Sequence, residues 1–402
     1  MTAPTTLHSA VDEILPGLVA DRRHLHEHPE LGMQEVETSR FVAERLAQLG
    51  VEDIRTGIAN TGVTGLIRGT NPDGPGAGKV VLLRADMDAL PMEEENDVEY
   101  RSQNPGVMHA CGHDAHTAML MGTARILMGM RDQFAGAVKL LFQPCEERPP
   151  GGAKFMIEQG VMENPTVTGA FAIHMANSLP VGVVGTRAGA QQAAADLFTI
   201  TVQGKGGHGA APHTTVDPVV VASQIVVALQ TLVSRETDPL ASVVVTVGTF
   251  NAGSAPNIIP DTASLRGTVR TLDQEIRERT ADRMKTLVEG VAKSLGATAT
   301  LDYEWGYPAL VNDAGMAQLV LETAHEVVGP ERTMVIPPSM PGEDMSYFLQ
   351  QVPGCMFVVG SMNEDKGFVW GHHHPKFDID EDSMATGVEM MTSVVLEYFR
   401  RG

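Results

Sequence analysis

The chain has 402 residues, of which 43% are hydrophobic and 20% charged, and its 29 basic and 50 acidic residues give a formal net charge of −21. This length allows about two to three domains with buried cores, and the composition is that of a folded rather than a disordered or membrane-spanning protein. The acidic surplus argues against a nucleic-acid-binding protein, because phosphates are contacted largely by Lys and Arg.

Three cysteines, Cys111, Cys145 and Cys355, are too few and odd in number for a disulfide framework, which favours a reducing compartment. Residues 1–10 lack the basic and then apolar pattern of a signal peptide. No apolar run is expected to approach the roughly 20 residues of a membrane helix. We therefore expect a soluble, cytoplasmic protein.

The first part of the chain predicts an α/β domain. Residues 7–49 are expected to form two helices broken near Pro29. Beyond them, β-branched runs alternate with helical patterns up to about residue 180. Strands are predicted at 80–83, 138–142 and 170–173, and the clearest helix at 115–130. This alternation is typical of a mainly parallel sheet with helices on its faces.

The middle of the chain has a different order, strand–helix–strand–strand–helix–strand, which is typical of a ferredoxin-like α+β unit. The expected elements are 197–202, 217–232, 242–250, 263–270, 273–295 and 297–303. After residue 305 the α/β alternation resumes, with a strand at 355–359 and a closing helix at 383–399. We predict a catalytic domain made of residues 1–187 and 304–402, with a smaller domain of residues 188–303 inserted into it.

Metal-binding residue types follow the predicted strands. Asp86 and Asp88 follow the first strand, Glu146 and Glu147 the second, and His174 the third. Since ligands of open α/β sheets bind beyond the carboxyl ends of the strands, these side chains are expected to converge.

Two further segments add histidine and thiol groups, namely His109-Ala-Cys-Gly-His-Asp-Ala-His116 and His372-His-His-Pro375. Thiolate, imidazole and carboxylate together suit Zn²⁺ or a similar divalent ion. Each group alone has an ordinary structural explanation, and their coincidence at strand ends is what points to a metal centre.

Other catalytic motifs are absent from the sequence. There is no Gly-x-Ser-x-Gly, no His-Glu-x-x-His and no P-loop. The segment Gly204-Lys-Gly-Gly-His-Gly209 matches Gly-x-Gly-x-x-Gly, but it continues into Ala-Ala-Pro-His rather than a helix. No acidic residue follows it at about 20 positions, so dinucleotide binding is excluded.

Four long motifs resemble the metal-dependent amidohydrolases of the aminoacylase and hippurate hydrolase type, which include the plant auxin-conjugate hydrolases. The motifs are Leu83-Arg-Ala-Asp-Met-Asp-Ala-Leu-Pro91, Gly106-Val-Met-His-Ala-Cys-Gly-His-Asp114, Phe142-Gln-Pro-Cys-Glu-Glu147 and Gly204-Lys-Gly-Gly-His208. This resemblance implies a three-layer, metallopeptidase-like α/β domain with an inserted dimerisation domain. It also implies hydrolysis of N-acyl-amino acids, which are small molecules.

The resemblance further implies two divalent ions per subunit (Zn, Mn, Ni or Co) bridged by Cys111. The other implied ligands are His113, Glu147, His174 and His373. Because three histidines precede Pro375, His372 stays an alternative to His373. Glu146 would act as the general base and Asp88 would orient a ligand.

In the inserted domain, the resemblance implies that His208 reaches the active site of a partner subunit and stabilises the oxyanion, which would make the protein a dimer or tetramer. Asn257 and Arg270 would bind the substrate carboxylate. The ordinary alternatives are a loop histidine for His208 and a cross-strand salt bridge for Arg270.

A few polar residues near these motifs have structural interpretations. Asp114 is interpreted as a cap of the helix that follows it, and His26 as either structural or near the rim of the pocket. Glu343 and Asp344 either support the metal ligands or form a helix N-cap pair.

Two other functions are compatible with these residues. One is a dipeptidase or carboxypeptidase of the same fold, and the other is a non-catalytic protein with a structural zinc site. Structural zinc sites are closed and usually rich in cysteine, whereas this chain offers more ligands, mostly His and carboxylate.

Overall fold

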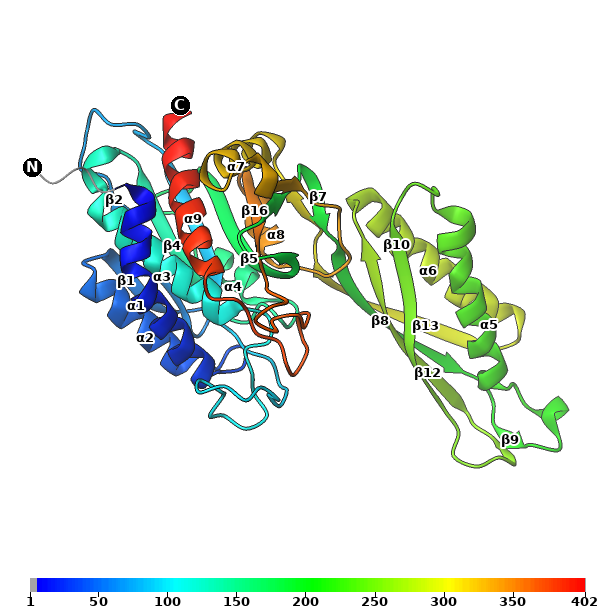
Figure 1. The fold of residues 1–402 in the computed structure, drawn as a ribbon. Helices are drawn as coiled ribbons and strands as arrows, with labels where there is room; N and C mark the ends of the chain where they lie inside the picture. The colour runs from blue at the N-terminus through cyan, green and yellow to red at the C-terminus, as the bar shows by residue number, and fades with distance from the viewer. Residues whose placement is uncertain (1–5, 402) are drawn as a thin grey trace, which may run out of the picture. The chain divides into compact units, whose positions relative to one another are not determined.

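The computed structural model describes residues 6–401, and the chain divides into two compact units (Figure 1). Unit 1 comprises Met1–Gly189, Val311–Pro337 and Asp344–Gly402, and unit 2 comprises Ala190–Leu310 and Pro338–Glu343. Each unit has its own sheet and its own hydrophobic core.

Unit 1 is built on an eight-stranded sheet. In spatial order its strands are β1 (Glu52–Ile58), β2 (Gly62–Arg68), β4 (Ala137–Gln143), β3 (Val80–Asp86), β5 (Gly169–Pro180), β16 (Gly354–Met362), β6 (Val184–Thr186) and β15 (Thr333–Val335). The central neighbours β4, β3, β5 and β16 run parallel, whereas β2 and β6 join them antiparallel. The predicted α/β class is confirmed, and the parallel part is the centre of a mixed sheet.

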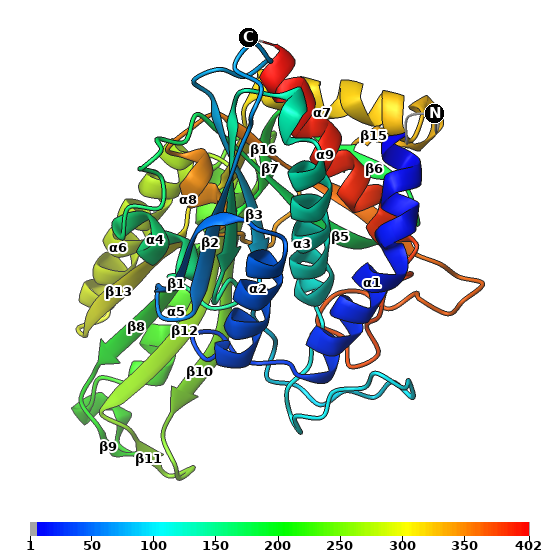
Figure 2. The ribbon, with the colours of Figure 1, turned by 90° about the vertical axis from the view of Figure 1, so that its left-hand side faces the viewer.

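Helices cover both faces of this sheet (Figure 2). One face carries α3 (His113–Gly129) and α9 (Ser383–Arg400), with α1 (Leu7–Glu27) packed against both. The other helices of unit 1 are α2 (Val36–Gln48), α4 (Gly152–Glu158), α7 (Ala314–Val327) and α8 (Met345–Leu349). Figure 2 shows α4 and α8 on the face opposite α3. The predicted break between the first two helices is confirmed.

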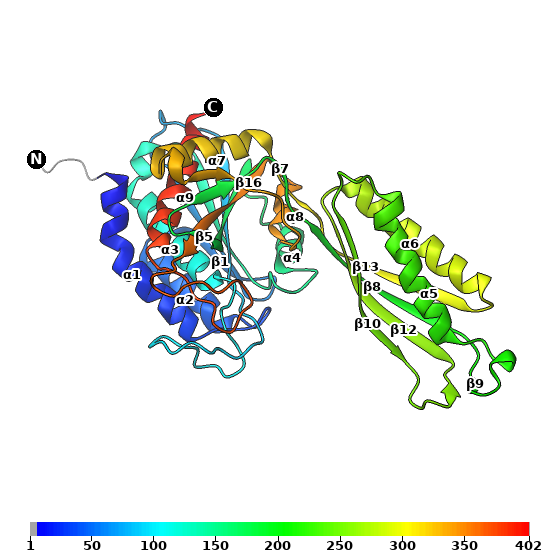
Figure 3. The same ribbon diagram turned by 45° about the vertical axis from the view of Figure 1, so that its right-hand side comes forward.

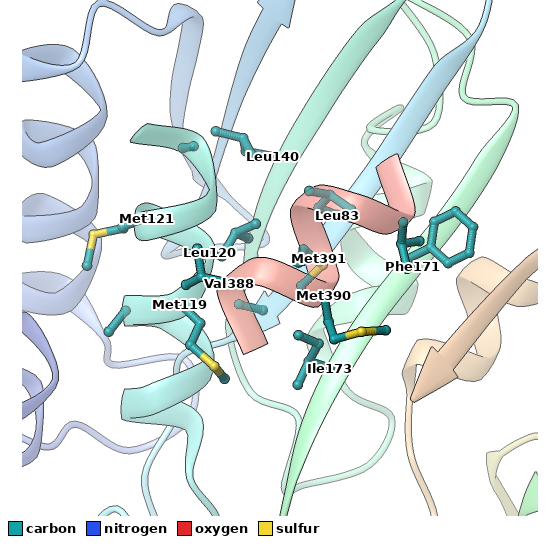
Figure 4. Close-up of a cluster of buried hydrophobic side chains, with 14 of the residues drawn as sticks. Leu83, Met119, Leu120, Met121, Leu140, Phe171, Ile173, Val388, Met390 and Met391 are labelled. Carbon is teal, nitrogen blue, oxygen red and sulfur yellow. The ribbon is translucent and has the colours of Figure 1, made fainter. Parts of the chain in front are cut away.

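The core of unit 1 lies between the central strands and the helices α3 and α9 (Figure 4). Leu83 of β3, Leu140 of β4 and Phe171 of β5 lie in the same cluster as Leu120 of α3 and Met391 of α9, and all five are buried. Apolar burial on this scale contributes roughly 25 cal/mol per Å² removed from water. It therefore fixes α3, whose first residue is His113, against the sheet.

Unit 2 is an antiparallel four-stranded sheet with two helices on one face (Figure 3). The strand order is β10 (Val243–Ala252), β12 (Thr262–Thr271), β8 (Ala194–Gln203) and β13 (Thr298–Tyr307), and the helices are α5 (Pro218–Thr231) and α6 (Gln274–Ser294). In chain order β8 is the first strand of this sheet, and it lies between the third, β12, and the fourth, β13, as in a ferredoxin-like unit. Unit 2 also contains the short pair of β9 (Gly207–His208) with β11 (Ile258–Ile259). The strands β7 (Gly189–Gln192) and β14 (Leu310–Asn312) form a separate two-stranded pair.

Two features differ from the sequence expectations. The hairpin β1–β2 was not predicted, because the edge strand β1 buries few of its side chains and so lacks an apolar alternation.

The helical segment Pro218–Glu236 is also long and apolar enough, by length and composition, to cross a membrane. Helices that pack in the core of a domain pass the same test of length and composition, so this single segment is weak evidence of a membrane span. Val221 and Ile225 of this segment are buried in the core of unit 2, whereas Val220 and Val227 are exposed.

Two glycines of unit 2 provide a test of its packing. A Cβ on Gly267 of β12 would lie 2.1 Å from the carbonyl oxygen of Thr246 on β10, whereas a Cβ on Gly290 of α6 would meet no atom within 4 Å. We expect Gly267→Ala to destabilise the protein by about 1–3 kcal/mol and Gly290→Ala to stabilise it by about 0.5–1 kcal/mol through helix propensity. Thermal unfolding of both variants checks this, and equal midpoints would contradict it.

Candidate metal centre

The candidate site lies at the carboxyl ends of the central parallel strands. Asp86 is the last residue of β3, Glu146 and Glu147 closely follow β4, and His174 belongs to β5. These three strands are parallel neighbours, so their ends meet at one edge of the sheet. His113 joins them from the first position of α3, and the loop after β16 brings His373.

The structure brings all five predicted metal ligands together in two groups that share Cys111. The first group is Cys111, His113 and His174, and the second is Cys111, Glu147 and His373; within each group the ligand atoms lie within 4.8 Å of one another. Cys111 Sγ lies 3.6 Å from His174 Nε2, and Glu147 Oε1 lies 3.1 Å from His373 Nε2. The thiol therefore belongs to both sets of donors.

Backbone carbonyls set the orientation of two of these imidazoles. His174 donates from Nδ1 to the carbonyl oxygen of Met175 at 2.7 Å, and His113 donates from Nδ1 to the carbonyl oxygen of Asp88 at 2.9 Å. In each ring Nε2 is therefore the nitrogen available to bind a metal ion. Within the described residues, the buried Nε2 of His113 has no hydrogen-bond partner. Since a buried polar atom is costly without one, this atom fits a metal ligand.

The two adjacent histidines, His372 and His373, differ in their contacts. His372 uses its Nε2 to donate to the carbonyl oxygen of Met175 at 3.0 Å, and burial lowers its pKa to about 3. His373 has a backbone φ of 62°, and its Nε2 reaches Glu147. This geometry supports His373 as the ligand and gives His372 a structural hydrogen bond.

The electrostatics of the site favour a cation. Burial raises the pKa of the Cys111 thiol well above its usual range, and the charges of Glu147 and Glu146 raise it further. Burial alone would lower the pKa of His113, but Asp86 and Asp88 outweigh it and raise the pKa to about 10. The shift of the Cys111 pKa is due mainly to burial, whereas the shift of the His113 pKa shows that carboxylates surround this imidazole. The donor set of sulfur, imidazole and carboxylate therefore fits divalent metal ions.

Asp88 connects the two sides of the centre. Its carboxylate accepts hydrogen bonds from the backbone N–H groups of Glu146 and Glu147, at 2.9 and 3.0 Å. Its carbonyl oxygen accepts the hydrogen bond of His113, described above. One residue thus fixes a histidine and the two adjacent glutamates. The Glu146 side chain is buried, and its carboxylate lies within 4.8 Å of ligand atoms of His113 and Glu147.

A layer of buried polar residues behind the ligands was only partly predicted. Asp86 accepts a 2.6 Å hydrogen bond from His116 Nδ1, and His116 Nε2 accepts the N–H of Met175. Both nitrogens of His116 are thus engaged by protein groups, although Asp86, His113 and His116 would also qualify as a metal-binding group. No spacing in the sequence indicated this pairing, because His116 lies one helical turn after His113 and resembled a further ligand.

Asp344, interpreted either as a support or as a helix cap, belongs to the same layer. It is the N-cap residue of α8, but its side chain makes no capping hydrogen bond. Its carboxylate instead accepts hydrogen bonds from Arg84 at 2.8 Å and from Gln143 at 2.7 Å. Arg84 also donates to Asp86 at 2.6 Å, so the support interpretation agrees with the geometry.

The three functional residues predicted in the middle of the chain lie in unit 2. His208 and Asn257 lie close together, because His208 of β9 pairs with Ile258 of β11 and the Asn257 carbonyl accepts the N–H of Gly209. Both side chains are exposed. Arg270 of β12 is half-buried and donates to the carbonyl oxygens of Asp196 and Val269 and to the Thr268 hydroxyl. Among the described residues, no carboxylate forms an ion pair with Arg270, so the salt-bridge alternative is not supported.

Comparisons with known proteins show what the chain is similar to. The model of peptidase family M20/M25/M40 matches residues 82–397. The chain is 43% identical over 384 residues to thermostable carboxypeptidase 2 of Saccharolobus solfataricus, covering 95% of both chains. It is 44% identical over 302 residues to N-acyl-L-amino acid amidohydrolase of Geobacillus stearothermophilus, covering 75% of this chain and 80% of the relative.

A plant protein and a solved structure extend the comparison. IAA-amino acid hydrolase ILR1-like 4 of Arabidopsis thaliana is 39% identical over 385 residues, covering 95% of this chain and 85% of the relative. The crystal structure of Bacillus subtilis YXEP, described as a dinuclear metal binding peptidase from the M20 family, matches with a TM-score of 0.84 and 32% identity. That match covers 96% of this chain and 99% of YXEP.

Replacement of the shared thiol tests the centre. We expect Cys111→Ser to weaken binding of Mn²⁺ or Zn²⁺ by at least 10-fold, because it removes the donor common to both groups. Cys355→Ser is the matched control, since Cys355 is also buried and unpaired but lies in β16 beside the Thr186 hydroxyl. Metal content after dialysis, measured by elemental analysis, distinguishes the variants. Wild-type metal content in Cys111→Ser would show that the ions lie elsewhere.

Proposed function

The chain belongs to peptidase family M20/M25/M40, and we propose that it hydrolyses the amide bond of N-acyl-amino acids to a carboxylic acid and a free amino acid. N-acetyl and N-benzoyl amino acids are the proposed substrate types. One observation carries this proposal: Cys111 belongs to two ligand groups, and Glu146 lies beside them. The amidohydrolase relative supports the substrate class.

Two divalent ions, of Zn, Mn, Ni or Co, would be held by this centre. The proposed ligands are Cys111, His113, Glu147, His174 and His373, with Cys111 common to both ions. When bound, such ions polarise the scissile carbonyl and lower the pKa of water to about 7. The imidazoles, which would be neutral with the ions bound, are each oriented by a contact of the other ring nitrogen or of the backbone.

Glu146 is the proposed general base. Its carboxylate would take the proton of the attacking water and deliver it to the departing nitrogen, which must leave as an amine rather than an amide anion. Glu147 next to it is engaged by His373 and is therefore assigned to metal binding. The backbone N–H groups of Glu146 and Glu147 both donate to the Asp88 carboxylate, and these two bonds would fix the positions of the two glutamates relative to each other.

Residues of unit 2 are proposed to complete the reaction. His208 would stabilise the oxyanion in the active site of a partner subunit, which implies a homodimer or a tetramer. Asn257 and Arg270 would bind the free carboxylate of the substrate. The lack of an ion-pair partner for Arg270 in the described residues leaves its charge available for such a ligand. The three unpaired, buried cysteines support a reducing compartment such as the cytoplasm.

Glu146→Gln tests the assigned base. We expect kcat to fall by about 10²–10⁴-fold with metal content unchanged, because the amide cannot accept the water proton. Glu158→Gln, at an exposed position of α4, is the matched control and is expected to retain wild-type kcat. Hydrolysis of N-acetyl-amino acids by metal-reconstituted protein gives both values. Near-native turnover by Glu146→Gln would remove it from this role.

A carboxypeptidase is the second candidate, since a relative at 43% identity bears that name. Both reactions need the same metal centre, so the substrates must distinguish them. We expect kcat/KM to be higher for N-acetyl- or N-benzoyl-amino acids than for dipeptides with the same C-terminal residue and a free α-amino group. A measured preference for the dipeptides would favour the peptidase and contradict the proposed substrate class.

A further inference from the structure

Arg22 of α1 joins two segments that carry proposed metal ligands. Its side chain is fully buried, and Nε donates to Asp114 Oδ2 at 2.7 Å while Nη2 donates to Asp378 Oδ1 at 2.7 Å. Asp114 follows His113 directly, and Asp378 lies in the segment that begins at His373. A single guanidinium thus connects the start of α3 to the loop after β16. Asp114 is therefore an ion-pair partner inside α3 rather than a helix cap.

Further buried groups fix the positions of these two carboxylates. His26, one turn after Arg22 on α1, approaches Asp114 Oδ2 with Nδ1 at 2.8 Å and Glu94 with Nε2 at 3.2 Å. The Tyr100 hydroxyl donates to the other oxygen of Asp378 at 2.7 Å. Burial and the charge of Arg22 would lower the pKa of His26, but its hydrogen bonds to the carboxylates raise it to about 9.

The loop bearing His373 is fixed at both ends. At its start, the backbone N–H of His373 donates to the carbonyl oxygen of Ala110 at 2.8 Å. At its end, Asp378 accepts the hydrogen bond of Arg22. Removal of Arg22 would leave Asp114 and Asp378 buried with less opposing charge. The separation between the segments would then no longer be fixed by a shared cation.

We propose that Arg22 is a positioning residue that sets the separation of the segments carrying His113 and His373, and thereby the affinity for divalent metal. The inference rests on the proposed metal-dependent function. Buried ion pairs contribute little net stability compared with apolar side chains, so a specific arrangement is the expected benefit of this one. The rigid, planar guanidinium suits this role, because it donates in fixed directions to Asp114 and Asp378 and also, at 3.3 Å, to Glu381.

The sign of the effect separates positioning from simple electrostatics. Loss of a positive charge near an acidic site should by itself strengthen the binding of a cation. A positioning role predicts the opposite, because misplaced ligands bind metal more weakly. Support of a metal ligand is typically worth about 10- to 100-fold in metal affinity.

The test measures binding of Mn²⁺ and Zn²⁺ by chelator competition in the full-length Arg22→Met and Arg22→Lys variants. We expect about 10- to 100-fold weaker binding by Arg22→Met and partial recovery by Arg22→Lys, which retains the charge. The matched control is Arg277→Met. Arg277 is a buried arginine of unit 2 that pairs with both carboxylate oxygens of Asp196, so its loss is expected to lower stability but not metal affinity.

Each outcome has a defined meaning. Unchanged or tighter metal binding by folded Arg22→Met would overturn the proposal, even if its unfolding temperature fell. If Arg22→Met does not fold, Asp378→Asn replaces it, with the same expected weakening and the same overturning result. If the wild type binds two ions but does not hydrolyse N-acyl-amino acids, the proposed reaction fails while the role of Arg22 is still decided by metal affinity. A wild type that binds no divalent ion would overturn both.

Discussion

The gathering of acidic groups at one edge of the sheet, each of which needs an opposing positive charge or a hydrogen-bond donor, is the constraint on which the centre of unit 1 depends. The carboxylates of Asp86, Asp88, Glu146 and Glu147 and the thiol of Cys111 all lie at this edge. In a medium of low dielectric constant such a set is unfavourable unless cations or protons balance it. Arg84 and His116 donate to Asp86, and Asp86 and Asp88 raise the pKa of His113, which favours its protonated form. Divalent ions are the alternative, and they are compatible with ionised donors.

The strands and helices of unit 1 hold these acidic groups and His113 close together at one edge of the sheet. Parallel strands deliver acidic residues to a common edge, and α3, which is buried along most of its length, delivers His113. Backbone carbonyls then orient the imidazoles, so ligand geometry depends on main-chain positions that packing already fixes. Hydrophobic packing thereby supplies the free energy that holds a locally unfavourable arrangement together.

The sequence predicted the features that depend on local pattern. The order of strands and helices identified both folds, and the position of acidic and histidine residues after apolar strands identified the edge where they meet. It could not identify pairings between distant segments. Arg22 was not singled out, and Asp114 was interpreted as a helix cap, because the contact between α1 and α3 is a tertiary one. The edge strand β1 was missed for a related reason, since its side chains are largely exposed and show no period.

The run of histidines before Pro375 contains two residues whose roles the sequence alone cannot distinguish. His372 and His373 are chemically identical neighbours before one proline, so composition and spacing cannot separate them. The structure does, because the positive φ of His373 turns its ring toward Glu147 while His372 donates to a carbonyl of β5. A backbone conformation that is uncommon outside glycine thus accompanies the different contacts of two chemically equivalent side chains. Such a conformation persists only where its surroundings hold it. Here the hydrogen bond from the His373 N–H to the carbonyl oxygen of Ala110 joins it to the segment carrying Cys111, so the imidazole and the thiol are placed together.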